Sequence, residues 1–298
     1  MTEKIYSVFE SMGVRTAINM PLKGHSSFRV GGVCRLAIFP SDLNTFVDTL
    51  SVLKKENVPF RVIGRGSNIL FGDGVVEEAL VFTEGVNDIT VNGTDIMATA
   101  GVTLSSLASA AADAGLTGLE FAKGIPGSVG GAMFMNAGAY GGEMSDIVVS
   151  SVAFDLESGK TVDVTDHFFG YRKSLYSENR DLICISCRMT LRHGEKEKIF
   201  EKMKAFAESR REKQPLNYPS AGSYFKRPCD NFAGKLIEDA GLKGYRVGDA
   251  CVSEKHAGFV VNLGNATAED VLALEKHVRD TVYKKFGILL EREVQLID

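Results

Sequence analysis

The chain of 298 residues carries a formal net charge of −4, and 44% of its residues are hydrophobic and 24% charged. This ordinary globular profile allows one domain or two to three small ones, and it excludes long disordered or collagen-like sequence. The negative charge argues against a nucleic-acid partner, and no apolar stretch reaches the ~18 residues that span a bilayer. Residues 1–20 show no secretory-signal pattern, so we expect a cytoplasmic protein without a membrane partner.

The first predicted elements form a βαβ unit. Short β-rich runs predict strands over Arg35–Phe39, Phe60–Ile63 and Ala79–Phe82. Between the first two, apolar residues recur at helical spacing over residues 43–53, and Ser41 precedes them as a candidate N-cap.

A hairpin and a helix follow. The pair Asn92-Gly93 predicts a tight turn between strands at Asp88–Val91 and Asp95–Ala100. The alanine-rich segment Leu104–Ala114 predicts a helix, because Gly115 behind it is a natural terminating glycine.

The chain changes character near residue 193, where a charge-rich helix is predicted over Glu195–Lys213 with Ile199, Met203 and Phe206 on one face. We therefore place a domain boundary near residue 195. Predicted strands and helices alternate irregularly along the chain, which gives an α+β class with mixed sheets. The remaining predicted strands are Ile147–Asp155, Lys160–Val164 (after a turn at Glu157–Gly159), Asp181–Leu191, Gly258–Asn262 and Leu289–Leu296, and the remaining helices are Asn231–Ala240 and Ala268–Phe286.

The five cysteines do not form a disulfide framework, because an odd number without a signal sequence predicts reduced thiols. Cys184 and Cys187 form a C-x-x-C motif, which also suits a metal or redox centre. They lie inside a predicted strand, however, where residues three apart point to opposite faces. No second such pair exists and no histidine stands at metal-ligand spacing, so we expect a structural role and no metal site.

Two glycine clusters suit an anionic ligand. In Gly64–Asn68 a Gly-x-Gly turn follows a predicted strand, so that backbone N–H groups can converge on a phosphate while Ser67 and Asn68 add donors. A tight turn without a ligand explains this segment equally well, since it is neither a dinucleotide fingerprint nor a P-loop. The stretch Gly124–Gly142 has seven glycines in nineteen residues and no apolar periodicity, so we expect no regular element there. Two such clusters fit a long dinucleotide-like ligand, whether a flavin or a nicotinamide.

Seven motifs occur in one order along almost the whole chain: His25–Gly32, Gly64–Ile69, Gly124–Gly131, Asn136–Gly141, Tyr171–Ser174, Gly222–Pro228 and Leu290–Val294. In this set the chain resembles the UDP-N-acetylenolpyruvoylglucosamine reductase (MurB) family of peptidoglycan-pathway flavoenzymes. The short spacing after Tyr171-Arg172 resembles the type II form, which lacks an extra substrate-capping loop.

The resemblance implies a two-lobed FAD-binding region of the vanillyl-alcohol-oxidase type over residues 1–195, with lobes at about 1–84 and 85–195, and a smaller α+β substrate domain over 196–298. It also implies that NADPH gives a hydride to bound FAD, which then reduces the enolpyruvyl ether of a UDP-linked sugar. We expect a monomer. The implied FAD contacts are Arg29, Gly64, Arg65, Gly66, Ser67, Asn68, Gly124, Ile125, Gly127, Ser128, Gly130, Gly131, Asn136, Ala137 and Gly138.

Hydride addition to the alkene leaves negative charge on the α-carbon and its carboxylate, which requires donors or positive charge already oriented toward them. Arg172 supplies a charged fork suited to a carboxylate, although a surface ion pair explains it better when the residue is taken alone. The resemblance implies that Arg172 is a catalytic residue.

Two further catalytic residues follow from the resemblance. It implies that Ser223 donates the proton, although the residue is otherwise an ordinary turn serine. It also implies a role for Glu293, which we expect to be protonated or hydrogen-bonded, because an ionised carboxylate would repel the developing charge. Glu291 lies two residues earlier, so sequence alone does not choose between them. Gln295 stands where related sequences often have arginine.

The expected substrate contacts are Tyr171, Lys226 and Arg227. A Lys-Arg pair also fits a solvated surface. Residues 253–256 are candidates for the diphosphate and uridine, although His256 more simply fits a structural histidine. Two other functions stay open: an oxidase on the same flavin fold, and a flavin- or nucleotide-binding module without turnover.

Overall fold

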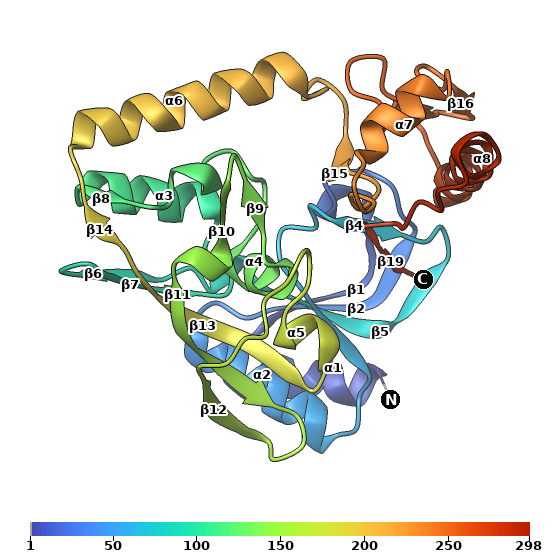
Figure 1. Cartoon of the computed structure of the whole chain (residues 1–298). Helices are drawn as coiled ribbons and strands as arrows, with labels where there is room; N and C mark the ends of the chain where they lie inside the picture. The colour runs from blue at the N-terminus through green and yellow to red at the C-terminus, as the bar shows by residue number, and fades with distance from the viewer. Residues whose placement is uncertain (1) are drawn as a thin grey trace. The chain divides into compact units, whose positions relative to one another are not determined.

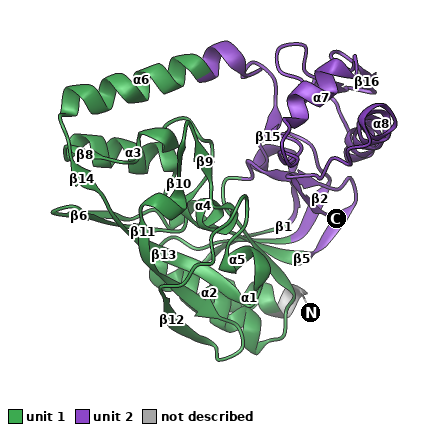
Figure 2. Ribbon diagram, viewed as in Figure 1, with its two compact units in different colours: residues 1–18, 36–65, 78–209 green, residues 19–35, 66–77, 210–298 purple. Residues whose placement is uncertain are grey.

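The computed structural model describes residues 2–298, and its contacts group the chain into two compact units (Figure 2). Unit 1 holds residues 1–18, 36–65 and 78–209, and unit 2 holds residues 19–35, 66–77 and 210–298. These compact units do not test the predicted domain boundary near residue 195, which stays a prediction. No helix among residues 2–298 is long and apolar enough to cross a membrane.

One sheet has the strand order β1-β2-β5-β3, and Figure 1 labels the first three of these strands. Its strands are β1 (Arg15–Pro21), β2 (Val33–Phe39), β5 (Val75–Phe82) and β3 (Phe60–Ile63), and the unit boundary crosses the first three. The predicted elements of the βαβ unit are present, with α2 (Leu43–Lys55) between β2 and β3.

The N-cap of α2 differs from the prediction. Asp42 caps the helix: its carboxylate accepts from the Thr45 N–H at 2.9 Å, and the Thr45 hydroxyl accepts from the Asp42 N–H at 3.1 Å. Ser41 was the wrong choice by one residue, because its hydroxyl instead donates to the Asp42 carboxylate. A reciprocal capping box satisfies two backbone donors, which a single serine does not.

The second sheet of unit 1 is antiparallel throughout, in the order β12-β11-β13-β7-β6. Both predicted hairpins are confirmed: Asn92 pairs with Asp95, and Asp155 pairs with Lys160. Gly93 has the positive φ of +60° that the first turn requires. The strands are β6 (Ile89–Asn92), β7 (Asp95–Thr99), β11 (Val148–Asp155), β12 (Lys160–Val164) and β13 (Leu182–Thr190).

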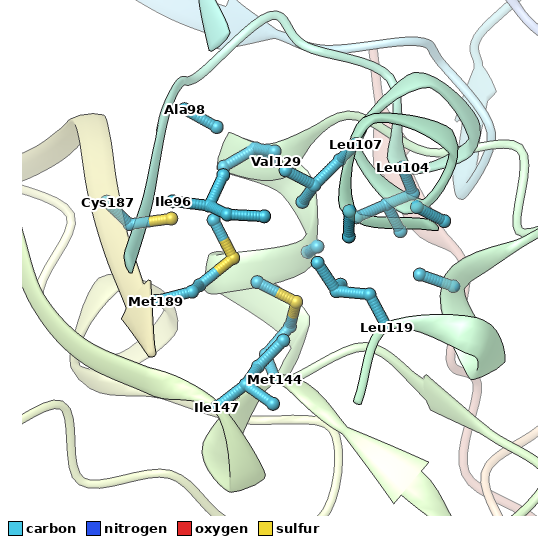
Figure 3. Packing of buried hydrophobic residues seen from close by; sticks show 14 of the residues in the cluster. Ile96, Ala98, Leu104, Leu107, Leu119, Val129, Met144, Ile147, Cys187 and Met189 are labelled. Atoms are coloured by element: carbon cyan, nitrogen blue, oxygen red, sulfur yellow. The ribbon is translucent and has the colours of Figure 1, made fainter. Parts of the chain in front are cut away.

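Helices α3 (Leu104–Asp113) and α4 (Val129–Met135) pack with this sheet into one apolar core (Figure 3). In the figure, Ile96 and Met189 from the strands lie close to Val129 from α4. The predicted end of α3 is confirmed, since Gly115 follows it with φ +69°. Helix α6 (Lys196–Lys213) begins one residue after its predicted start, and two of the three residues on its predicted apolar face, Ile199 and Met203, are buried.

The prediction that Cys184 and Cys187 point to opposite faces of their strand is wrong. On β13, Ser186 pairs with Val152 and Cys184 pairs with Ala153, so one extra residue is inserted between them. This β-bulge shifts the alternation by one, and both thiols join the same apolar core. Burial raises the pKa of Cys184 to about 12 and raises that of Cys187 well above its ordinary value, which disfavours a reactive thiolate.

The expectation of no regular element in Gly124–Gly142 is also wrong. The stretch contains α4 and a hairpin of β9 (Gly138–Ala139) and β10 (Gly142–Glu143). Tyr140 and Gly141 form its two-residue turn with φ of +53° and +83°, as a type I′ turn requires. Tertiary contacts override the weak helix propensity of the glycines, because the apolar face of α4 is buried in the core.

Unit 2 packs α7 (Ala233–Asp239) and α8 (Ala268–Phe286) against a sheet in the order β15-β18-β17-β16. The predicted bounds of α8 are confirmed, because Thr267 and Asp270 form a capping box at its start and Gly287 ends it with φ +70°. The strands of the sheet are β15 (Ser220–Ser223), β16 (Arg246–Val247), β17 (Ala250–Val252) and β18 (Phe259–Asn262).

The predicted strand Leu289–Leu296 is only partly correct. The observed strand β19 covers Gln295–Ile297 and pairs in parallel with β4 (Ile69–Phe71). Residues 289–294 form a single bridge, between Arg292 and Phe225. The other elements are α1 (Thr2–Ser11), α5 (Leu175–Glu178), β8 (Leu116–Thr117), β14 (Arg192–His193) and short 3-10 turns.

Candidate active site

In unit 1 the two glycine motifs meet at Gly64 and Ser128. A Cβ atom at Gly64 would lie 2.2 Å from Ser128 Oγ, so only glycine fits there. Ser128 is 1% exposed and caps α4, with its hydroxyl 3.5 Å from the Gly131 N–H. Segments about sixty residues apart in the chain thus form one glycine-lined surface.

The backbone of α4 shows which of its groups are available to a ligand. The N–H groups of Val129 and Gly130 donate to Val102 O and Ala100 O, both at 2.8 Å, so they are not free anion donors. Gly131 is exposed, and a Cβ there would meet only Ser128 Oγ, at 3.6 Å. Nothing in the packing of the chain requires glycine at this position, and the missing side chain leaves room for the close approach of a ligand. The residues therefore fit a flavin dinucleotide on this side of α4.

Asn136 organises the loop that follows α4. It ends the helix in the left-handed conformation with φ +43° and is fully buried. Its amide donates to Glu143 Oε1 at 2.9 Å and to Gly170 O at 3.1 Å, and its Oδ1 accepts from the Ser145 N–H at 3.0 Å. The side chain of this predicted cofactor residue therefore acts within the chain.

Arg172 binds the same loop. Its guanidinium lies 3.5 Å from Asn136 O and 3.3 Å from Gly138 O, and its Cζ is 5.3 Å from the Tyr171 ring centre. Its backbone has φ +54°, a conformation that costs a non-glycine residue about 1–2 kcal/mol. Arg172, the predicted catalytic residue, therefore has a strained backbone and binds the glycine-rich hairpin, which belongs to the predicted cofactor motif.

A buried hydrogen-bond cluster anchors the loop that carries Arg172. Ser151 Oγ lies 2.7 Å from His167 Nε2 and 2.5 Å from Tyr176 Oη. Burial lowers the pKa of His167 and raises the pKa of Tyr176. The two ends of residues 167–176 are thereby fixed inside unit 1, on either side of Arg172.

In unit 2 the second half of the first glycine motif packs on residues 25–27. Gly66 has φ +61°, and a Cβ there would lie 2.1 Å from His25 O. The Ser27 N–H donates to Gly66 O at 3.1 Å, and the Ser27 hydroxyl donates to Ser220 O at 2.7 Å. Ser27 therefore links the glycine turn to β15, the strand that ends at Ser223.

Arg29 lies nearby in the same motif. It is exposed and has φ +54°. The amide of Asn262 holds this backbone by donating to Phe28 O at 3.2 Å and to Arg29 O at 3.3 Å.

Ser223 and Glu293 lie on paired segments beside Asn68. The Glu293 N–H donates to Tyr224 O at 2.9 Å, and the Asn68 amide donates to Glu293 O at 3.1 Å. Tyr224 is buried while Ser223, its neighbour, is exposed. Unit 2 thus brings together two predicted catalytic residues and a predicted cofactor residue.

The predicted substrate residues have partners on the surface. Lys226 forms an ion pair with Glu291, and the Arg227 guanidinium lies 4.7 Å from the Phe232 ring centre. His256 Nδ1 accepts from the Gly258 N–H at 3.1 Å, and burial lowers its pKa, which supports the structural reading of this histidine. Within residues 2–298 no group of three or more His, Cys, Asp or Glu side chains is arranged to hold a metal ion.

Sequence reasoning missed three residues that orient the site: Glu143, Asn262 and Glu275. Glu143 orients Asn136, Asn262 fixes the backbone of Arg29, and Glu275 binds Tyr224. Each acts across a large sequence separation or from outside the glycine motifs, so no local pattern marks it.

Two family models match the chain. The model described as UDP-N-acetylenolpyruvoylglucosamine reductase, C-terminal domain, matches residues 214–297, and the model described as FAD binding domain matches residues 34–165. They support an FAD-binding domain followed by a second domain.

Similar proteins bear the same description. The chain is 45% identical over 292 residues to UDP-N-acetylenolpyruvoylglucosamine reductase of Caldicellulosiruptor bescii, covering 97% of this chain and 92% of that protein. It is 45% identical over 280 residues to the reductase of Clostridium beijerinckii, covering 94% and 92%. The crystal structure of the reductase from Thermus caldophilus matches with a TM-score of 0.80 at 34% identity, covering 96% of this chain and 99% of that one. These matches confirm the predicted α+β fold class and the resemblance.

Proposed function

The chain belongs to the UDP-N-acetylenolpyruvoylglucosamine reductase family, and on that premise we propose that Arg172, Ser223 and Glu293 act on its substrate. It is an FAD-dependent oxidoreductase that uses NADPH to reduce UDP-N-acetylglucosamine enolpyruvate to UDP-N-acetylmuramate in peptidoglycan synthesis. When bound at the two glycine motifs, FAD would supply the hydride-transfer chemistry between NADPH and the β-carbon of the enolpyruvyl group. The proposal concerns which side chains meet the charge and the proton demand that this hydride transfer creates.

Arg172 stabilises the negative charge that develops on the substrate carboxylate and α-carbon. Its guanidinium is permanently charged and its fork matches a carboxylate. The contacts to Asn136 O and Gly138 O support this role, because they orient the side chain before substrate arrives. The strained backbone at φ +54° supports it as well, since such strain is concentrated at functional sites.

Ser223 gives its hydroxyl proton to the α-carbon, which completes the change from a carbon–carbon double bond to a single bond. A serine hydroxyl is a weak acid, but a carbanion is basic enough to take its proton. Glu293 hydrogen-bonds the reacting carboxyl region from the neighbouring segment. The observation that carries the proposal is the hydrogen bond from the Glu293 N–H to Tyr224 O, which holds the segments of Ser223 and Glu293 side by side.

The cofactor and substrate contacts complete the proposal. The glycine-lined backbone at Gly64, Gly66 and Gly131, together with the other motif residues, lines the FAD site, and Tyr171, Lys226 and Arg227 bind the UDP-sugar. Residues 1–195 form the FAD-binding region and residues 196–298 the substrate domain. The protein works as a monomer in the cytoplasm, where its five unpaired cysteines suit a reducing environment.

Separating the two half-reactions tests these roles. Anaerobic stopped-flow spectroscopy follows flavin reduction by NADPH and then flavin reoxidation by UDP-N-acetylglucosamine enolpyruvate. We expect Ser223→Ala to leave the first rate unchanged and to reduce the second by at least 10²-fold. A matched control is Ser220→Ala, at the other end of β15. An unchanged substrate half-reaction in Ser223→Ala would refute the proton-donor role, and air reoxidising the wild type faster than substrate would favour an oxidase.

A further inference from the structure

The buried carboxylate of Glu275 is hydrogen-bonded to both of the segments that carry Ser223 and Glu293. Glu275 is on α8 and is 5% exposed. A buried carboxylate is stable only when it is hydrogen-bonded and paired. Its partners come from three places in unit 2: Tyr224 Oη at 2.8 Å, Arg292 Nη1 at 3.2 Å and Arg279 Nη1 at 3.5 Å.

Two of these partners are the direct neighbours of the proposed catalytic residues. Tyr224 follows Ser223, and Arg292 precedes Glu293. The two partners belong to segments joined to each other by the Phe225–Arg292 bridge and by the hydrogen bond from Glu293 to Tyr224. One carboxylate oxygen, Oε2, accepts from both Tyr224 and Arg292.

Tyr224 is suited to be a permanent donor in this cluster. It is 1% exposed and packs edge-on against Phe28 and Phe225. Burial, and next to it the charge of Glu275, raises the pKa of Tyr224, so the phenol stays protonated and donates a hydrogen bond to the carboxylate. Arg279 lies one helical turn after Glu275 and binds the second oxygen, which fixes the orientation of the carboxylate.

We propose that Glu275 is a positioning residue for the substrate half-reaction: through Tyr224 and Arg292 it fixes Ser223 and Glu293 relative to each other. This inference rests on the proposed roles of those two residues. Fixing the neighbouring side chain restrains the backbone on which each reacting group is carried. A displacement of about 1 Å at a reacting group costs ~10²-fold in rate, so the loss of this restraint has a kinetic effect without a change in chemistry.

The variants Glu275→Gln and Tyr224→Phe test the proposal in the FAD-loaded enzyme. Each removes a charge or a hydrogen bond with little change in volume. In anaerobic stopped flow we expect reoxidation by UDP-N-acetylglucosamine enolpyruvate to slow by ~10–10²-fold at saturating substrate. The substrate concentration at half-maximal rate should change less than threefold, and flavin reduction by NADPH should stay within twofold.

Two control variants on α8 separate positioning from general damage. Glu269→Gln changes an exposed carboxylate in the first turn and should behave as wild type. Val278→Ala removes buried apolar volume near Glu275 and lowers the melting temperature without touching the three hydrogen bonds. If Val278→Ala, at a comparable loss of melting temperature, slows reoxidation as much as Glu275→Gln does, the effect is structural and the proposal fails.

The outcomes distinguish this inference from the proposed function. If Ser223→Ala is inactive in the second half-reaction while Glu275→Gln and Tyr224→Phe react at wild-type rates, only the role of Glu275 is overturned. Ser223→Ala active would overturn the proposed function itself, whatever the Glu275 variants do. The inference is supported if Ser223→Ala and the Glu275 and Tyr224 variants all slow reoxidation by substrate, while flavin reduction stays intact and the Val278→Ala control reacts at the wild-type rate.

Discussion

Arg172 and His167 are two residues whose environments have measurable consequences. Arg172 adopts a left-handed backbone conformation and binds two carbonyl oxygens of the glycine-rich hairpin. His167 lies a few residues before it, buried against Ser151. The first residue is the one proposed to meet the charge that develops in the reaction, and the second is a buried titratable group near the same loop.

Arg172→Lys should slow the substrate half-reaction by ~10²-fold, because lysine keeps the charge but loses the planar fork that fits a carboxylate. Flavin reduction by NADPH should change little. Stopped-flow measurement of both half-reactions checks this, with Lys173→Arg at the exposed neighbouring position as the control. Equal rates in Arg172→Lys and wild type would show that the fork is not used.

Thermal stability should fall as the pH decreases below about 6.5. Burial lowers the pKa of His167 below its ordinary 6.5, in opposition to the nearby Asp166. The unfolded chain therefore binds a proton that the folded protein does not, so the free energy of unfolding decreases as the pH falls through the unfolded pKa. It levels off only below the lower, folded pKa.

Melting temperatures between pH 8 and pH 5 measure this effect. In His167→Gln the fall should be shallower, though not absent, because burial lowers the pKa of His256 as well. His193→Gln, at an exposed position, should retain the wild-type slope. A slope in His167→Gln that equals that of wild type would contradict the assignment.

At the scale of elements, the surroundings of the short helix α4 show that packing requires glycine at one motif position and not at another. Gly64 packs against Ser128, the N-cap of α4, and must be glycine because a Cβ there would meet Ser128 Oγ. Gly131 in α4 itself has room for a methyl group on the protein side. A substitution at Gly131 therefore tests ligand binding separately from folding, whereas one at Gly64 affects both.

Gly131→Ala should therefore stabilise the FAD-free protein while weakening its affinity for FAD. Alanine is favoured over glycine in a helix by about 0.5–1 kcal/mol. Gly64→Ala should instead lower both stability and affinity, because Ser128 must move. Thermal unfolding of the apoprotein and fluorescence titration with FAD test both variants. Undiminished FAD affinity in Gly131→Ala would remove this residue from the cofactor site.

At the scale of the whole molecule, the cysteines report on packing. Cys34, Cys184, Cys187 and Cys251 are buried, and Cys229 is exposed. Burial raises the pKa of Cys34 to about 11 and also raises the pKa of Cys251. Buried thiols with raised pKa values react slowly, because the thiolate is the reactive form.

A thiol reagent such as Ellman's reagent should modify Cys229 rapidly in the native protein and all five cysteines only after unfolding. Cys229→Ser should abolish the rapid phase. A rapid phase that survives in Cys229→Ser would show that one of the buried cysteines is accessible, which would revive the reactive reading of the C-x-x-C motif.

Elements with strong local signals could be predicted from the sequence alone. The Asn92-Gly93 hairpin and α8 follow from turn and capping chemistry that acts within a few residues. The motif residues also identified the family, because their types and order are properties of the sequence itself.

Tertiary structure alone decided features that depend on distant contacts. The bulge that brings Cys184 and Cys187 into one core depends on pairing with β11, and α4 depends on burial against the sheet. Asn68 meets Glu293 across 225 positions, and Glu275 meets Tyr224 across 51. A hydrogen bond between such residues forms only when the backbone has folded, so no local pattern encodes it.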